Sequence, residues 1–144
     1  MGKTVILIRS DILPAEYVPY IETHEKWEAY VARKKGYNLY KKAVREYKKD
    51  NNIEDFSEER RKGFFSALQD FRYEFRHEYA IYKEYEQALE EGKLDEYHSW
   101  VMGLRPDPSK MLVWMKNDTK IRVSIYQKLK GGTKHYFLKG HDDL

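Results

Sequence analysis

The chain has 144 residues, of which 41% are hydrophobic and 35% are charged, and its formal net charge is +3. This composition is too apolar for a disordered chain and too polar for a membrane protein, so we expect a single globular domain spanning residues 1–144. The lack of cysteine excludes disulfides, thiolate metal sites and cysteine nucleophiles. No apolar run is long enough to span a membrane and no signal-peptide pattern is present, so we expect a cytoplasmic location without membrane contact.

The first third of the chain predicts one strand and two helices. Residues 5–8 form a short apolar run rich in β-branched side chains, which is typical of a buried strand. Beyond two prolines, apolar residues recur at helical intervals over residues 21–35, and Gly36 stands where a C-terminal cap belongs. Tyrosines and a valine at helical spacing predict a second amphipathic helix over residues 37–49.

A long helix is predicted over residues 58–91, because apolar and aromatic residues keep a spacing of three to four positions until Gly92. Such a helix would exceed the usual length in globular proteins. We therefore expect either a break near Gly63 or an apolar stripe that also contacts a partner. Residues 93–102 predict one more short helix, and the two prolines that follow predict a rigid connector.

The C-terminal segment has the clearest strand pattern in the chain. Over residues 121–129, apolar and polar side chains alternate with a period of two. The pairs Asn117-Asp118 and Gly131-Gly132 are typical of tight turns, so residues 111–138 are expected to form a three-stranded meander. With the N-terminal strand beside it, the predicted fold class is α+β. Three to four helices, one of them long, would pack on a small, mostly antiparallel sheet.

Charge is distributed unevenly along the sequence. Residues 37–50 carry a net charge of +3 and residues 104–144 carry +5, whereas residues 51–103 carry −6. The second half of the predicted long helix is therefore acidic and stands between two basic segments. Such asymmetry favours electrostatic steering of a charged partner.

The surplus of aromatic residues indicates a protein-binding surface, because Trp and Tyr give interfaces a large contact area with few torsions to freeze. Tyr73 and Tyr85 lie off the main stripe of the predicted long helix, which is therefore apolar around more of its circumference than one core contact requires. A wide stripe buried in the core and a homodimer formed through this helix are the alternatives. The candidate protein-binding residues are Tyr73, Tyr82, Tyr85, Glu86, Tyr97, Trp100 and Trp114.

Basic residues interleaved with tyrosines indicate nucleic acid as an alternative partner. Lysine and arginine neutralise phosphates, and exposed tyrosines stack on unpaired bases. The competing interpretation is that the tyrosines face the core while the lysines form a solvated helix face or protect a sheet edge. The candidate nucleic-acid-binding residues are Lys34, Lys35, Lys41, Lys42, Arg45, Lys48 and Lys49 around the second predicted helix, and Lys120, Arg122, Lys128 and Lys130 in the predicted meander.

Common catalytic and metal-binding motifs are missing from the sequence. Glu74-x-x-His77 has the spacing of a di-metal carboxylate motif but occurs once, and His24-Glu25 lacks the second histidine of a zinc protease. We therefore expect neither a metal nor a cofactor. A second alternative function is a small metal-independent RNase, which would use general acid and base groups on the sheet. Its conceivable members are Arg122, Tyr126, His135 and Tyr136.

No motif matches a known family over a useful stretch. The short, cysteine-free composition, rich in Tyr, Lys and Glu, resembles that of small phage accessory proteins that bind host factors. The resemblance implies a phage or mobile-element protein that inhibits or modulates a host protein complex. We predict a non-enzymatic protein-binding module, with a nucleic-acid-binding protein as the alternative.

Overall fold

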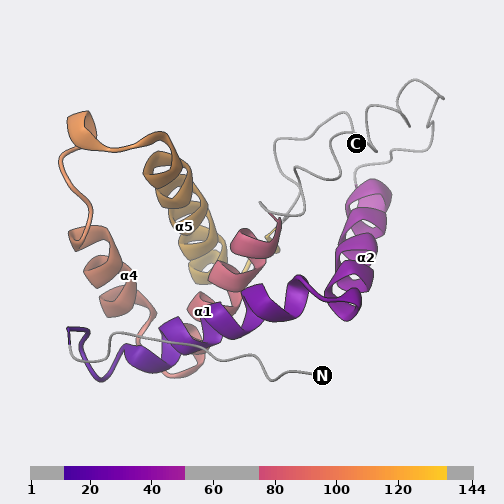
Figure 1. The fold of residues 1–144 in the computed structure, drawn as a ribbon, viewed down its shortest axis with the longest axis horizontal. Helices are drawn as coiled ribbons and strands as arrows, with labels where there is room; N and C mark the ends of the chain where they lie inside the picture. The colour runs from indigo at the N-terminus through magenta and orange to yellow at the C-terminus, as the bar shows by residue number, and fades with distance from the viewer. Residues whose placement is uncertain (1–11, 51–74, 136–144) are drawn as a thin grey trace. The chain divides into compact units, whose positions relative to one another are not determined.

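The computed structural model describes residues 12–50 and 75–135. Within these ranges the chain is helical, with no strand, so the predicted α+β class is wrong and the protein is a helical one. The predicted strand at residues 5–8 lies outside the described residues. In chain order the elements are helix α1 (Val18–Val31), helix α2 (Lys34–Asp50), a helical segment at residues 75–90, helix α4 (Leu94–Gly103), the 3-10 helix η1 (Pro108–Lys110) and helix α5 (Val113–Gly131) (Figure 1).

Helix α5 takes the place of the predicted C-terminal meander. Its buried residues are Asp118, Arg122 and Ile125, which recur at intervals of four and three, and Ile121 and Leu129 pack against the same core. Residues 121, 125 and 129 fit an alternation of period two, but they also lie one helical turn apart. A short apolar pattern of this kind fits both periods, and packing against the neighbouring helices decides between them.

Both turns predicted in this segment are wrong as hairpin turns. Asp118 is buried inside α5, where its carboxylate accepts a hydrogen bond from Arg122 Nε at 2.9 Å. Gly132 adopts a left-handed conformation (φ 68°) directly after α5, and the next amide, of Thr133, donates to the Lys128 carbonyl at 2.9 Å. This glycine therefore terminates a helix. Of the predicted third strand, residues 134 and 135 lack regular structure and the remainder lies outside the described residues.

The predicted helices at residues 21–35 and 37–49 are confirmed as α1 and α2, with different ends. Helix α1 ends at Val31, so Gly36 lies in the first turn of α2 and does not cap α1. A Cβ atom at Gly36 would collide with the backbone of Val31. The glycine is required here because the end of one helix approaches the start of the next.

Residues 75–90 confirm the C-terminal part of the predicted long helix, and its earlier part, with the expected break near Gly63, lies outside the described residues. Gly92 has a φ of 73°, and the Lys93 amide donates to the Ala88 carbonyl at 2.8 Å. This C-cap turns the chain into α4, which confirms the short helix predicted at residues 93–102.

The described residues divide into two compact units. Unit 1 comprises residues 12–26 and 80–135, and unit 2 comprises residues 27–50 and 75–79. This division does not test whether the units fold separately. The single-domain organisation therefore stays a prediction.

Tyrosines build much of the core of unit 1. The rings of Tyr20 and Tyr97 meet edge to face with centroids 4.8 Å apart, and Tyr85 approaches Tyr97 in the same manner at 5.8 Å. Ile81 and Ile125 are fully buried in the same cluster. Aromatic rings thus supply the volume that Leu and Ile supply in most cores.

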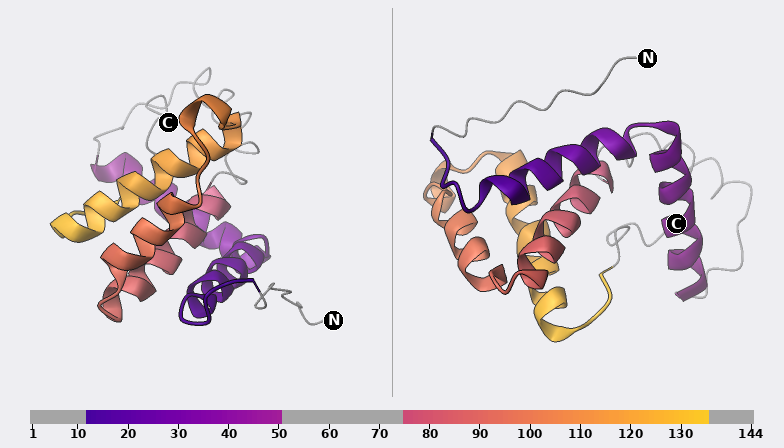
Figure 2. Two further views of the ribbon diagram at one scale, coloured as in Figure 1. Left: turned by 90° about the vertical axis from the view of Figure 1, so that its left-hand side faces the viewer. Right: turned by 90° about the horizontal axis from the view of Figure 1, so that it is seen from below.

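Helices α4 and α5 of unit 1 run antiparallel. Lys130, near the end of α5, lies 2.8 Å from Asp95 at the start of α4, and Arg105, just after α4, donates to Asp118 in the second turn of α5. Residues 104–112 connect the two helices (Figures 1 and 2). This connector therefore lies at the end of the helix pair opposite to Asp95 and Lys130.

Unit 2 also has an aromatic interior. The rings of Tyr40 and Phe75 lie 5.1 Å apart, and those of Trp27 and Tyr79 lie 5.4 Å apart. Val44, one turn after Tyr40 on α2, is buried as well. The tyrosine and valine therefore mark the inward face of α2, as its amphipathic pattern predicts.

Membrane contact and location are expectations that the fold tests only in part. None of the helices in the two described ranges combines the length and the apolar composition that a membrane crossing requires. The cytoplasmic location stays a prediction.

Candidate functional site

A buried ionic network lies at the centre of unit 1. Glu84 is almost inaccessible to solvent, and its carboxylate oxygens contact side chains from three other elements of the chain. Its Oε1 atom lies 2.7 Å from His24 Nδ1, and its Oε2 atom accepts hydrogen bonds from Arg122 Nη1 at 2.8 Å and from the Tyr97 hydroxyl. We call Glu84 with these three partners, together with Asp118, the Glu84 network.

Electrostatic attraction fixes the charge state of this network. Burial alone would raise the pKa of Glu84, but the opposing pull of Arg122 and His24 lowers the pKa to about 2. Burial likewise works against the charge of Arg122, yet Glu84 and Asp118 hold the pKa of its guanidinium well above the usual value. Glu84 and Arg122 are therefore a charged pair inside the protein. Each compensates a charge that would otherwise be very costly to bury.

A second polar chain lies beside the network, between α4 and its neighbours. The Tyr85 hydroxyl lies 2.7 Å from His98 Nδ1, and the His98 ring stacks on Tyr126 with centroids 4.1 Å apart. The Tyr126 hydroxyl donates to Asp95 at 2.5 Å. Burial, followed by the charge of Arg122, lowers the pKa of His98. The cationic form of His98 is thus disfavoured, because a cation there would be desolvated and repelled.

The Glu84 network explains how unit 1 holds its helices in register. Glu84 lies on residues 75–90, Arg122 on α5, Tyr97 on α4 and His24 on α1. Each donor reaches a carboxylate that has little access to water, so the network suits a structural role better than contact with a substrate. The sequence predictions missed it, although the i, i+4 spacing of Asp118 and Arg122 indicates one of its ion pairs.

Two of the predicted protein-binding residues belong to the core and cannot contact a partner in this conformation. Tyr85 is 0% exposed and Tyr97 is 1% exposed. The alternative weighed from sequence, a wide stripe buried in the core, describes Tyr85 correctly. Tyr82 and Trp100 are half-buried against the same core, and the Trp100 ring lies 4.9 Å from that of Tyr17.

The remaining predicted protein-binding residues differ in exposure. Glu86 is half-buried and lies 3.2 Å from Lys83. Tyr73 lies outside the described residues. Trp114, by contrast, is 62% exposed in the first turn of α5. Of the predicted set within the described residues, Trp114 is the aromatic residue that the surrounding structure leaves most available for binding.

Trp114 belongs to an exposed apolar group at the junction of the connector and α5. Its neighbours Leu112 and Val113 are 60% and 75% exposed. We call these three residues the connector surface. The sequence predictions missed the other two, because strand periodicity assigned the segment to a sheet.

The predicted nucleic-acid-binding residues also divide into exposed and buried groups. On α2, the exposed members are Lys35, Lys41, Lys42, Arg45 and Lys49, whereas Lys48 is half-buried and the Lys34 side chain lies outside the description. On α5, Lys120 and Lys130 are exposed and Lys128 is half-buried. Arg122 is a buried member of the Glu84 network, so it cannot contact phosphate in this conformation.

The residues weighed for an RNase are not arranged on a sheet. Arg122 is bound to Glu84 and Asp118, Tyr126 is bound to Asp95, and His135 is buried. Tyr136 lies outside the described residues. The sheet on which the hypothesis placed them is replaced by α5.

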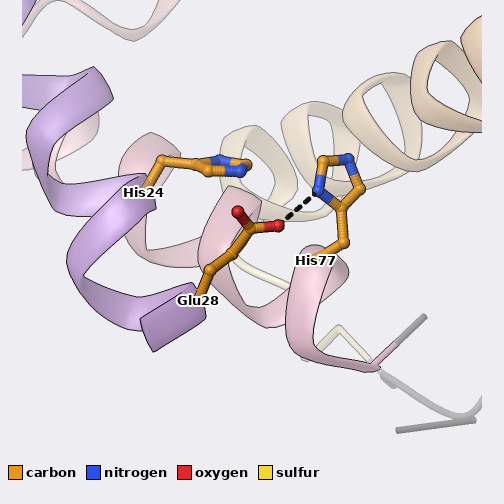
Figure 3. Close-up of side chains that lie close together, drawn as sticks. All are labelled: His24, Glu28 and His77. Atoms are coloured by element: carbon orange, nitrogen blue, oxygen red, sulfur yellow. Dashed lines mark hydrogen bonds and ion pairs between the residues drawn. The ribbon is translucent and has the colours of Figure 1, made fainter. Parts of the chain in front are cut away.

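Unit 2 contains a hydrogen bond between a histidine and a carboxylate that the sequence motifs did not indicate. Glu28 Oε1 on α1 lies 2.9 Å from Nδ1 of His77, which belongs to residues 75–90 (Figure 3). The spaced motif that contains His77 pairs it with Glu74, which lies outside the described residues. His24 is one turn before Glu28 on α1, but it belongs to unit 1 and binds Glu84 there.

Comparison of the chain with family models, curated proteins and solved structures finds no match.

Proposed function

We propose that the chain is a non-enzymatic protein-binding module and that the connector surface is its contact site. The observation that carries the proposal is the exposure of three consecutive apolar residues, Leu112, Val113 and Trp114, each at least 60% accessible. A partner that covers them would remove apolar area from water, which stabilises a complex by roughly 25 cal/mol per Å² before the costs of association.

The contrast with the other aromatic residues supports this choice. Unit 1 encloses Tyr20, Tyr85 and Tyr97 completely or nearly so, although each has a polar hydroxyl that could remain at the surface. Trp114 has the larger apolar area and yet remains exposed. Isolated exposed apolar residues are ordinary in soluble proteins, but grouped ones rimmed by polar residues mark interaction sites.

Site-specific photo-crosslinking tests the proposal. A benzophenone amino acid replaces Trp114 in the full chain, and a matched variant carries it at Gln127, an exposed position on the same helix. We expect a discrete protein adduct in extracts of the native host from position 114, competed by excess unlabelled chain, and none from position 127. No adduct from position 114, or equal adducts from both positions, would contradict the proposal.

The narrower hypothesis of a phage or mobile-element protein that modulates a host complex stays a prediction, because no described residue distinguishes it from other binding modules. The same holds for the absence of enzymatic activity. The photo-crosslinked partner, once identified, tests the first hypothesis directly.

Nucleic-acid binding through α2 is the second candidate, and the exposed basic face of that helix favours it. Tyr40 and Val44 are buried, so Lys41, Lys42 and Arg45 lie on the solvent side of α2. The face can supply phosphate contacts, but Tyr40 cannot stack on bases from the core.

A mobility-shift assay with single-stranded and double-stranded RNA and DNA tests this candidate. Wild-type chain should shift a probe at low salt, and the affinity should fall by about one power of salt concentration for each phosphate neutralised. Lys42→Glu combined with Arg45→Glu should abolish the shift, while Lys120→Glu on α5 should leave most of it. Absence of a shift at low salt would eliminate the candidate.

A further inference from the structure

The connector surface has a positively charged rim. Between residues 104 and 120 the exposed ionisable residues are Lys110, Lys116 and Lys120 on the basic side and Asp107 alone on the acidic side. Arg105 and Asp118 compensate each other, so neither contributes a net charge to the rim. The exposed residues of this segment therefore carry a net positive charge.

Helix α5 adds to this field in its first turns. Val113, Lys116 and Lys120 follow one another at intervals of three and four, so the two lysines extend from the apolar end along one exposed side of the helix. The first turn contains no acidic residue, and Leu112 at the N-cap position provides no side-chain hydrogen bond. The positive end of the helix dipole therefore lies beside the apolar residues without a negative group of this helix to offset it.

We infer that the connector surface binds an acidic amphipathic segment of a partner protein, one whose apolar side chains cover Leu112, Val113 and Trp114 while its carboxylates face Lys116 and Lys120. This inference deepens the proposed function and depends on it. Charge complementarity identifies the class of partner, because opposite potentials steer encounter and like charges across an interface are unfavourable.

Two other occupants fit the same surface less well. A second copy of the chain, related by a twofold axis, would bring Lys116 and Lys120 towards their own equivalents. An anionic membrane suits helices with an apolar face along their length, but the apolar residues of α5 beyond its first turn, such as Ile125 and Leu129, pack in the core of unit 1. A short protein segment, by contrast, can bind by contacting only the exposed first turn of α5.

Two synthetic helical peptides that share one leucine stripe provide the test, one flanked by glutamates and the other by lysines. Their binding to the full chain is measured by fluorescence anisotropy at low and high salt. We expect the glutamate peptide to bind at least roughly tenfold more tightly at low salt, which corresponds to about 1.4 kcal/mol. Lys116→Glu with Lys120→Glu should reverse the preference, and Lys42→Glu on α2 should leave it unchanged. Leu112→Ser with Trp114→Ser should abolish binding of both peptides.

Equal affinity for the two peptides, or binding of neither, would overturn the inference. It would also be overturned by Trp114-dependent binding to vesicles of phosphatidylglycerol and phosphatidylcholine without peptide binding, or by a dimer that Trp114→Ser dissociates. The photo-crosslinking experiment distinguishes failure of this inference from failure of the proposed function. An adduct at position 114 that maps to a segment without acidic residues leaves the proposed function standing and removes this inference, whereas no adduct removes both.

Discussion

The interior of unit 1 and the connector surface differ in which groups they expose: the interior buries charged groups, and the connector surface exposes apolar ones. In the interior, Glu84 and Arg122 keep their charges although water is excluded, and tyrosines form the core. At the connector surface, Leu112, Val113 and Trp114 face solvent, and the first turn of α5 beside them contains no acidic residue. The charges of the first region are paired within the chain. The second region has exposed apolar area and positive charge that a partner can cover and pair. Stability and binding should therefore respond to different residues.

The largest expected effect is on stability, from removal of one partner in the Glu84 network. Arg122→Met leaves Glu84 and Asp118 short of their shared cation, and uncompensated buried charge of this kind costs about 3–5 kcal/mol. Lys120→Met is the matched control, since Lys120 is exposed two residues earlier on α5. Its effect should stay within about 0.5 kcal/mol. Equilibrium unfolding in urea measures the stability of both variants. Equal losses of unfolding free energy would show that the network contributes no more to stability than an exposed lysine.

The second effect is a loss of stability at acidic pH. The pKa of Glu84 is about 2 in the folded chain, below the ordinary value of 4.5, so its contribution is fully present above pH 4.5 and is lost as the pH falls towards 2. A difference of this size corresponds to about 3 kcal/mol. The stability advantage of wild type over Glu84→Gln should therefore shrink as urea titrations are repeated from pH 5 down to pH 3. An advantage that does not change with pH would show that Glu84 is not ionised in the folded chain.

The smallest effect on stability is expected at the connector surface. Leu112→Ser with Trp114→Ser replaces side chains that are already at least 60% exposed, so each change should alter the free energy of unfolding by about 0.5 kcal/mol or less. The same double variant should lose peptide binding completely. A large loss of stability would mean that these residues are packed in solution, and the contrast between the two regions would then disappear.

Local patterns predicted the helices well where one period dominated. The spacing of Tyr40 and Val44 predicts the inward face of α2, and the glycine at position 92 marks the end of a helix, both of which the structure confirms. The meander predicted over residues 111–138 was wrong, because the spacing of residues 121, 125 and 129 fits both a strand period and a helix period. The candidate site was predicted only at Trp114. Its apolar neighbours became recognisable when the strand assignment was replaced by a connector and the exposed first turn of a helix.

The sequence by itself determined the aromatic richness of the protein, its separation into acidic and basic segments and the helix end at Gly92. These properties depend on composition and on neighbours within a few residues. The tertiary structure decided that Tyr85 and Tyr97 fill the core and which charges are paired. Tyr85 and Trp114 are both large aromatic residues, and Arg122 and Lys120 are both cations two positions apart on α5. Their different roles follow from contacts with residues far away in the sequence, because burial and ion pairing depend on which helices pack together.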